Sequence, residues 1–282
     1  MLLLALDTST SAVTVALHDG STVLSESTVI DVRAHVERLA PGIEEVLRGA
    51  GRSPAELTHI VTGTGPGPFT ALRIGVTTAR MLALATGAAV SGVCSLDALA
   101  FAAAELASPD GLLVATDARR REVYWAWYAG RRLTRVSGPG VAAPADLPED
   151  LRRLPAAGRG PLLYRDLFSR PAGPLDVSAS ALADFAVARL LRGEQLEEAT
   201  PRYLRRPDVA PAAAPKSVLG LDCGRWLGPT SRRWYSSRMC SSQVGRGAPE
   251  PGGPSSPSAL GASMWSPRTR LRRTARSSSG MP

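Results

Sequence analysis

An internal repeat constrains the fold of this chain more than any other feature. Residues from Leu112 onward repeat those from Leu2 onward at a constant offset, so that Asp117 falls on Asp7 and Gly130 on Gly20 without an insertion. Each copy contains a short apolar run, an aspartate turn and a second apolar run, a pattern typical of buried strands joined by a turn. A chain that carries this unit twice is expected to fold into two related α/β lobes.

Further elements follow from local patterns. Residues 2–24 predict a three-stranded antiparallel meander whose second turn is Asp19-Gly20, a strong hairpin signal. Residues 33–47 predict an amphipathic helix, which Pro41-Gly42 is expected to kink or divide because proline removes a backbone donor. Strands are expected at 59–62 and 90–93, and further helices at 70–88, 98–106 and 180–192.

A glycine-rich segment, residues 63–75, joins the expected strand at 59–62 to the helix that follows. Glycine permits positive φ and close backbone approach, and proline stiffens the turn. A helix N-terminus behind such a turn can also bind an anion. Asp7, Gly65 and Gly67 are therefore the candidate cofactor-binding residues. The alternative, which we favour, is a rigid corner that sets the direction of a packing helix.

Charge and cysteine content restrict the class of protein. The net charge of +8 comes from an Arg-rich segment beyond Gly220, and the part before it carries equal numbers of basic and acidic residues. The folded part therefore gives no electrostatic argument for RNA binding, although the tail itself can be an RNA-binding segment. Three widely spaced cysteines, an N-terminal apolar run that stops at Asp7 and the lack of a long apolar stretch predict a cytoplasmic protein without a membrane partner.

Several motifs resemble the TsaB family, also called YeaZ. The resemblance covers roughly residues 1–207 and implies an α/β fold of two related lobes in the actin-like, Hsp70-like and sugar-kinase-like (ASKHA) superfamily. We place the lobes at 1–109 and 110–207, followed by a Pro/Arg/Ser-rich tail, 208–282, that is expected to be disordered. Pro68 and Ala71 depart from the family's usual serine and glycine. The matching segments are Leu4–Thr10, His35 before Leu39-x-Pro-x-Ile43, Gly63–Gly75, Asp117-Ala-Arg, Glu122-Val-Tyr and Pro201-x-Tyr-Leu-Arg.

The resemblance implies a supporting role in making N6-threonylcarbamoyladenosine (t6A) at position 37 of tRNAs that read ANN codons. Such a chain pairs with a TsaD-like catalytic subunit, works with a TsaE-like ATPase and contacts tRNA only through the complex. A homodimer is possible when it is alone. The chain itself is expected to bind no cofactor, ATP being used by the complex, and to hold no metal and no catalytic residue.

The expected partner-binding surface lies on two helices. Small residues at four-residue spacing in the second helix form a ridge that another helix can approach closely. The candidates are His35, Leu39, Ile43, Arg73, Gly75, Ala79 and Ala83.

The alternative function is a free-standing ASKHA-type ATPase or small-molecule kinase that uses Asp7 and the glycine corner. The equivalent second loop, 117–122, argues against it because it lacks glycine, and bulky side chains occupy the space that a phosphate needs. Its arginines are expected to be solvated and paired with Glu122, or else to bind phosphate by charge. His18, His35 and His59 are too widely spaced for a closed metal site.

Overall fold

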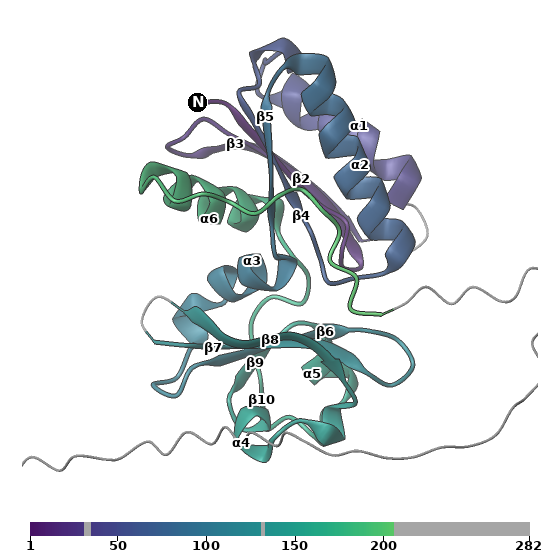
Figure 1. The fold of residues 1–282 in the computed structure, drawn as a ribbon, viewed down its shortest axis with the longest axis vertical. Coiled ribbons are helices and arrows are strands. Elements are labelled where there is room, and N and C mark those ends of the chain that lie inside the picture. Colours follow the sequence, from purple (N-terminus) through teal and green to yellow (C-terminus); the bar gives the residue numbers. More distant parts are fainter. Residues whose placement is uncertain (31–34, 131–132, 206–282) are drawn as a thin grey trace, which may run out of the picture. The chain divides into compact units, whose positions relative to one another are not determined.

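The computed structural model describes residues 1–30, 35–130 and 133–205, except the side chains of 35 and 36. These residues fall within one compact unit and form two five-stranded sheets, shown in Figure 1. The predicted tail, 208–282, lies outside the described residues. The first sheet has the order β3 (Val23–Ile30), β2 (Ala12–His18), β1 (Leu3–Asp7), β4 (His59–Gly63) and β5 (Ala89–Val93). The second has the order β10 (Arg170–Pro171), β9 (Pro155–Ala157), β6 (Leu112–Asp117), β7 (Val123–Ala129) and β8 (Thr134–Ala142).

The two sheets have the same topology, which confirms the prediction of two related lobes. β1 is antiparallel to β2 and parallel to β4, and β6 is likewise antiparallel to β7 and parallel to β9. The predicted meander is also confirmed, because β2 pairs antiparallel with β3. The two copies of the repeat thus form β1 and β6, the central strands of equivalent sheets.

Helices α1 (His35–Gly49) and α2 (Phe69–Thr86) pack on one face of the first sheet. Leu4, Leu6 and Val15 of the sheet share a buried cluster with Leu39 and Ile43 of α1. α1 continues through Pro41, so the predicted division of this helix is wrong. Apolar side chains on both sides of the proline pack into the same cluster, and this burial opposes the break that a proline favours.

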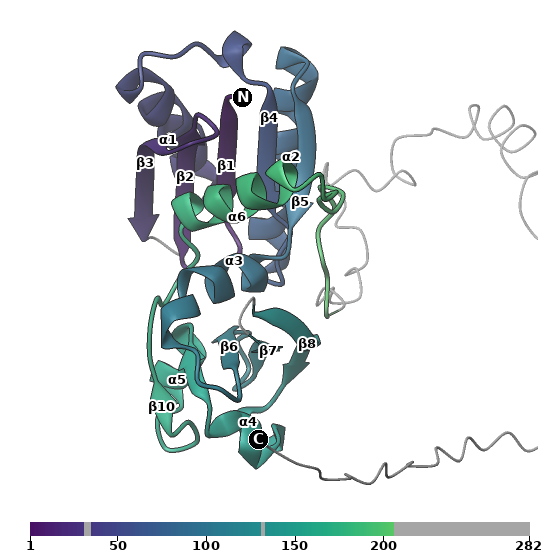
Figure 2. The ribbon, with the colours of Figure 1, turned by 90° about the vertical axis from the view of Figure 1, so that its left-hand side faces the viewer.

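Helix α6 (Ala179–Leu191) packs on the opposite face of the first sheet, as Figure 2 shows. Leu182 and Ala186 share a buried cluster with Leu3 and Ala5 of β1. Our division at 109/110 put this helix in the second lobe, and the structure corrects that assignment. The alternation of β1 leaves a second apolar face on the first sheet, and α6 covers it.

Two of the remaining helices contact the second sheet. Helix α3 (Ser95–Ala102) contacts both α6 and β6, and the buried cluster around it extends from Leu3 to Leu112. The short α5 (Arg159–Leu163) packs on β6. The others are α4 (Glu149–Arg152) and the 3₁₀ helices Pro54–Glu56, Ala104–Leu106 and Pro144–Asp146.

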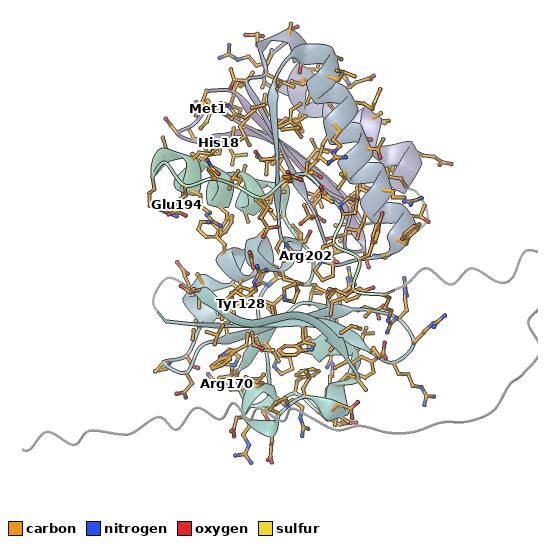
Figure 3. The ribbon with its side chains drawn as sticks, in the orientation of Figure 1. Met1, His18, Tyr128, Arg170, Glu194 and Arg202 are labelled. Atoms are coloured by element: carbon orange, nitrogen blue, oxygen red, sulfur yellow. The ribbon has the colours of Figure 1, made fainter. Side chains whose placement is uncertain are left out.

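Residues 197–205, which we call the C-terminal strap, run back along the first lobe. The Gly92 amide donates to the Glu197 carbonyl (2.7 Å), and the Arg202 amide donates to the Thr64 carbonyl (2.8 Å). Arg202 lies at the level of the junction between the lobes (Figure 3). Arg205 then reaches the second lobe, where its Nη1 donates to the Ala118 carbonyl (2.7 Å). The strap therefore contacts both lobes. In the described ranges, no helix is long and apolar enough to cross a membrane.

Candidate functional site

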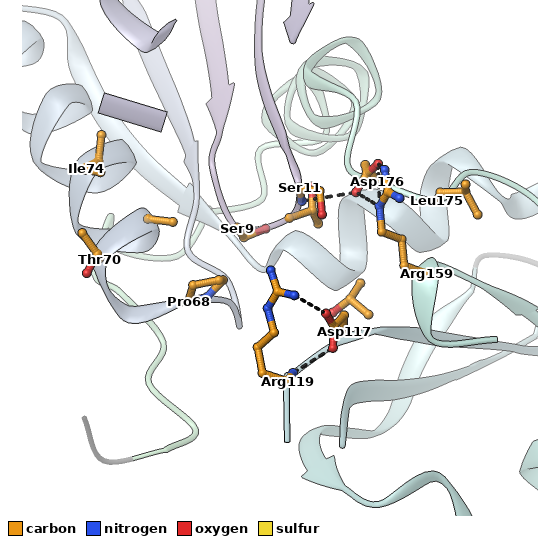
Figure 4. Close-up of a pocket in the computed structure, with 13 residues that line it drawn as sticks. Ser9, Ser11, Pro68, Thr70, Ile74, Asp117, Arg119, Arg159, Leu175 and Asp176 are labelled. Atoms are coloured by element: carbon orange, nitrogen blue, oxygen red, sulfur yellow. Dashed lines mark hydrogen bonds and ion pairs between the residues drawn. The ribbon is translucent and has the colours of Figure 1, made fainter. Parts of the chain in front are cut away.

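The equivalent turns of the two copies line one pocket of about 260 Å³ between the lobes (Figure 4). The turn after β1 contributes Ser9 and Ser11, and the turn after β6 contributes Asp117 and Arg119. Arg159, at the start of α5, completes the polar lining with Asp176. The start of α2 forms another wall through Pro68, Thr70, Ala71 and Ile74.

Asp7 is fully buried at the end of β1 and does not line this pocket. Its Oδ1 accepts hydrogen bonds from the Ser9 amide and the Ser9 hydroxyl, both at 2.7 Å. Its Oδ2 accepts from the Ser95 hydroxyl at 2.6 Å. The carboxylate therefore holds the turn after β1 and ties it to the start of α3, the role that aspartate commonly has in a turn.

The glycine corner is shaped by close contacts within the protein. A Cβ on Gly67 would lie 2.4 Å from the Ser9 carbonyl oxygen. Gly65 has φ +90°, and its amide donates to the Ser95 hydroxyl at 3.0 Å. The Ser95 amide donates back to the Gly65 carbonyl at 2.9 Å. These contacts match the rigid-corner interpretation, because the Gly65 amide has a protein partner and is not directed at a ligand.

The second turn contains ion pairs that we did not predict. Glu122 forms its ion pair with Arg205 of the strap, whereas Arg119 pairs with Asp117, at 3.3 Å between Nη1 and Oδ2. No sequence signal identified Arg205 as the partner of Glu122, because the two residues are far apart in the chain. The strap thus supplies a positive charge to this turn through Arg205.

Arg159 and Asp176 form the second ion pair of the pocket, which the sequence did not reveal. Arg159 Nε and Nη2 donate to Asp176 at 2.8 and 2.6 Å, and this hydrogen bonding raises the pKa of the guanidinium. Asp176 Oδ1 also accepts from the Ser11 amide at 3.3 Å. The pair therefore joins the turn after β1 to the second lobe. The positive charge of Arg159 and the negative charge of Asp176 balance each other within the pocket.

A second polar cluster, centred on Asp97 of α3, joins the lobes. The Tyr128 hydroxyl donates to Asp97 at 2.7 Å, and Arg135 donates to the same oxygen at 3.0 Å. Burial raises the pKa of Asp97, and it raises the pKa of the nearby Cys94 thiol to about 11. Cys94 is therefore an unreactive thiol at neutral pH. Within the described ranges, no three His, Cys, Asp or Glu residues are grouped to hold a metal ion.

Most of the predicted partner-binding residues point into the first lobe. Leu39, Ile43, Ala79 and Ala83 are buried in the cluster between α1, α2 and the sheet. A Cβ on Gly75 would lie 2.5 Å from the Thr8 hydroxyl. The small-residue ridge therefore brings α2 close to its own lobe, by the same geometry that would suit a partner helix. The side chain of His35 lies outside the described residues.

The outer face of α2 carries the exposed side chains instead. Arg73 is the one predicted residue on this face, and Met81 and Leu84 are 59% and 79% exposed. Two exposed apolar side chains therefore lie one turn apart on this face. Thr77 and Arg80 complete the face, which we call the outer α2 face.

Comparisons with known proteins agree with the duplicated fold. The model of the TsaD family, described as tRNA N6-adenosine threonylcarbamoyltransferase, matches residues 22–217. An uncharacterized protein of Mycobacterium tuberculosis is 39% identical over 214 residues, which is 74% of this chain and 94% of that protein. A longer relative from Mycobacterium leprae is also 39% identical, and the chain spans 57% of its length.

Relatives with informative names match part of this chain. The tRNA threonylcarbamoyladenosine biosynthesis protein TsaB of Escherichia coli is 38% identical over 128 residues, or 45% of this chain and 55% of that protein. The solved structure of YeaZ from Pseudomonas aeruginosa aligns with a TM-score of 0.60 and 30% identity over 72% of this chain and 100% of that structure. The shared topology and these matches show that the chain belongs to the TsaB (YeaZ) family.

Proposed function

We propose that this chain is a non-catalytic scaffold subunit of the machinery that transfers a threonylcarbamoyl group to N6 of adenosine 37 in tRNAs reading ANN codons. Its relatives in Escherichia coli and Bacillus subtilis are named for tRNA threonylcarbamoyladenosine biosynthesis, and its family model is that of a threonylcarbamoyltransferase. The chain acts by binding a TsaD-like catalytic subunit, in a system that also uses a TsaE-like ATPase.

One observation carries the non-catalytic part of this proposal. In an ATPase of this superfamily, an acidic residue after the first strand binds metal and the turn amides hold phosphate. Here both oxygens of Asp7 accept hydrogen bonds from Ser9 and Ser95, and the Gly65 amide donates to Ser95. These groups form hydrogen bonds with other residues of the protein and thereby stabilise the lobe.

The outer α2 face is the surface that we assign to the catalytic partner. Met81 and Leu84 supply apolar area, and the exposed Arg73 and Arg80 supply polar contacts at its edge. Interfaces of this kind have an apolar centre and a polar rim. In the absence of the partner, the same face allows the chain to pair with a second copy of itself.

Titration of the isolated full-length chain with ATP and magnesium tests the proposal. We expect no saturable heat up to about 1 mM ATP, because the dissociation constant of a degenerate site exceeds that value. The TsaE-like ATPase, titrated under the same conditions, is the positive control. Micromolar ATP binding with turnover by the chain alone would contradict the scaffold role and favour a free-standing ATPase or kinase.

A further inference from the structure

We propose that a basic and aromatic surface at the start of α2 binds RNA directly. We call it the arginine–aromatic surface, and it consists of Phe69, Arg73, Arg119, Arg121 and Tyr203. This inference goes beyond the scaffold role, in which the chain contacts tRNA only through the complex. It is also independent of the Arg-rich tail.

The turn between β6 and β7 presents its arginines in an unusual way. Arg119, Arg120 and Arg121 have φ values of 60°, 54° and 62°, so three successive non-glycine residues adopt the left-handed conformation. Such residues are unfavourable and persist where the surrounding structure holds them, often at functional sites. Here the Ala118 amide donates to the Glu122 carbonyl (3.0 Å), and Arg205 caps the Ala118 carbonyl. The result is a fixed turn with three exposed cationic side chains.

Arg121 is the most available of these charges. Its side chain is exposed and makes no ion pair or hydrogen bond with the part of the chain that the structure describes. Arg119 is partly balanced by Asp117 at 3.3 Å, but the guanidinium is 62% exposed and keeps donors for a second acceptor. A guanidinium with open donors suits a phosphate oxygen.

Aromatic rings lie at the start of α2 and on the strap, which contacts this turn through Arg205. The Phe69 and Tyr203 ring centroids are 4.6 Å apart with 34° between the planes, and Tyr203 is 40% exposed. The Arg73 guanidinium lies 4.1 Å from the Phe69 centroid, and its Nε donates to the Tyr203 hydroxyl at 3.1 Å. Ordered rings and guanidinium planes of this kind are the groups on which unpaired bases stack.

Two contacts connect the β6–β7 turn with the elements that carry the rings. Arg119 lines the same pocket as Thr70 of α2, and Arg205 links the strap that carries Tyr203 to the β6–β7 turn. This surface, the rest of the β6–β7 turn and Arg205 of the strap together carry five arginines and two acidic residues, although the chain before the tail is neutral overall. The zero net charge of the residues before the tail therefore does not reveal the local excess of positive charge in this region. The arginines are Arg73, Arg119, Arg120, Arg121 and Arg205, and the acids are Asp117 and Glu122.

Stacking groups combined with arginines favour RNA over an acidic protein as the occupant. RNA phosphates can pair with the arginines, and unpaired RNA bases can stack on the aromatic rings. A carboxylate of an acidic protein would pair with the arginines but would not stack on the rings.

Chemical protection of the full-length chain separates this surface from the tail. Arginines are modified with phenylglyoxal, with and without an unmodified tRNA transcript that reads an ANN codon, and each site is quantified by mass spectrometry. We expect tRNA to slow modification of Arg119 and Arg121 by about fivefold or more, since phosphate contacts occupy their donors. Arg38 and Arg170 are exposed elsewhere, Arg170 at the far end of the second lobe in Figure 3, and should react at unchanged rates.

Variants give an independent measurement of the same contacts. Arg121→Ala should reduce the salt dependence of tRNA binding by about one phosphate contact, whereas Arg170→Ala should leave it unchanged. Tyr203→Ala should weaken binding about tenfold, and Tyr203→Phe, which keeps the ring, should retain most of the affinity. Thermal unfolding of each variant verifies that the fold is retained.

Two results would overturn the RNA assignment. Protection confined to arginines beyond residue 205 would assign RNA binding to the tail alone. Unchanged tRNA binding by Arg121→Ala and Tyr203→Ala, with loss of binding to the TsaD-like subunit, would make this surface a protein interface. Both experiments use the chain without its partners, so they can fail while the scaffold role holds.

Discussion

Replacing Gly63 with alanine is expected to lower the free energy of unfolding by about 3–5 kcal/mol. A Cβ at this position would lie 1.6 Å from Asp7 Oδ2 and 2.6 Å from the Ser95 hydroxyl oxygen. Either the buried carboxylate loses its hydroxyl donor or β4 moves away from β1. Each outcome disrupts the centre of the first sheet, because β1 pairs directly with β4.

Urea unfolding followed by circular dichroism measures this effect. Gly42→Ala in α1 is the matched control, since its added Cβ would lie 3.5 Å from Val15, an ordinary contact distance. Alanine is favoured over glycine within a helix, so the control should be unchanged or more stable by up to about 1 kcal/mol. If Gly63→Ala and the wild-type chain have equal free energies of unfolding, the close packing of Gly63 against Asp7 does not contribute to stability.

Replacing Leu84 with glutamate should weaken binding to the TsaD-like subunit by about 100-fold or more, with little change in thermal stability. Leu84 is 79% exposed on the outer α2 face, so a charge there costs little in the isolated chain. In an interface, the same carboxylate would lose water without gaining a partner. Surface plasmon resonance with the immobilised catalytic subunit measures the affinity.

Two controls separate binding from folding. Leu191→Glu changes an equally open leucine, 72% exposed at the end of α6, and should leave the affinity unchanged. Ala79→Leu enlarges a side chain on the inner face of α2 that has no exposed surface. It should destabilise the isolated chain by about 1–3 kcal/mol, because the core is already filled. If Leu84→Glu and Leu191→Glu bind equally well, the outer α2 face is not the interface.

The central topology could be predicted because its signals are local. An apolar run, an aspartate turn and a second apolar run specify a strand pair within about 20 residues, and the chain carries this unit twice. The packing of α6 against the first sheet could not be predicted in this way. The apolar face of α6 is compatible with packing on either sheet. The sheet that it covers is determined by the path of the chain in three dimensions, which the sequence pattern does not show.

The candidate site was harder to predict, because it depends on contacts between residues far apart in the sequence. It also depends on which face of α2 is exposed. The ridge of Gly75, Ala79 and Ala83 was visible in the sequence, but periodicity does not show whether a helix face is covered by its own lobe or by a partner. Arg159 and Asp176 meet in the pocket without a motif that links them. The arginines of the β6–β7 turn were visible, whereas their neighbours Phe69 and Tyr203 come together only in the folded chain.

The most direct test of the scaffold role is the formation of t6A in a reconstituted reaction. TsaD-like and TsaE-like proteins are mixed with an unmodified tRNA transcript, ATP and a threonylcarbamoyl donor, and t6A is quantified by mass spectrometry of nucleosides. We predict t6A when the full-length chain is added, little or none when it is omitted or carries Leu84→Glu, and none with the chain alone. Formation of t6A by the chain alone, or at an equal rate without it, would contradict its role as a non-catalytic scaffold.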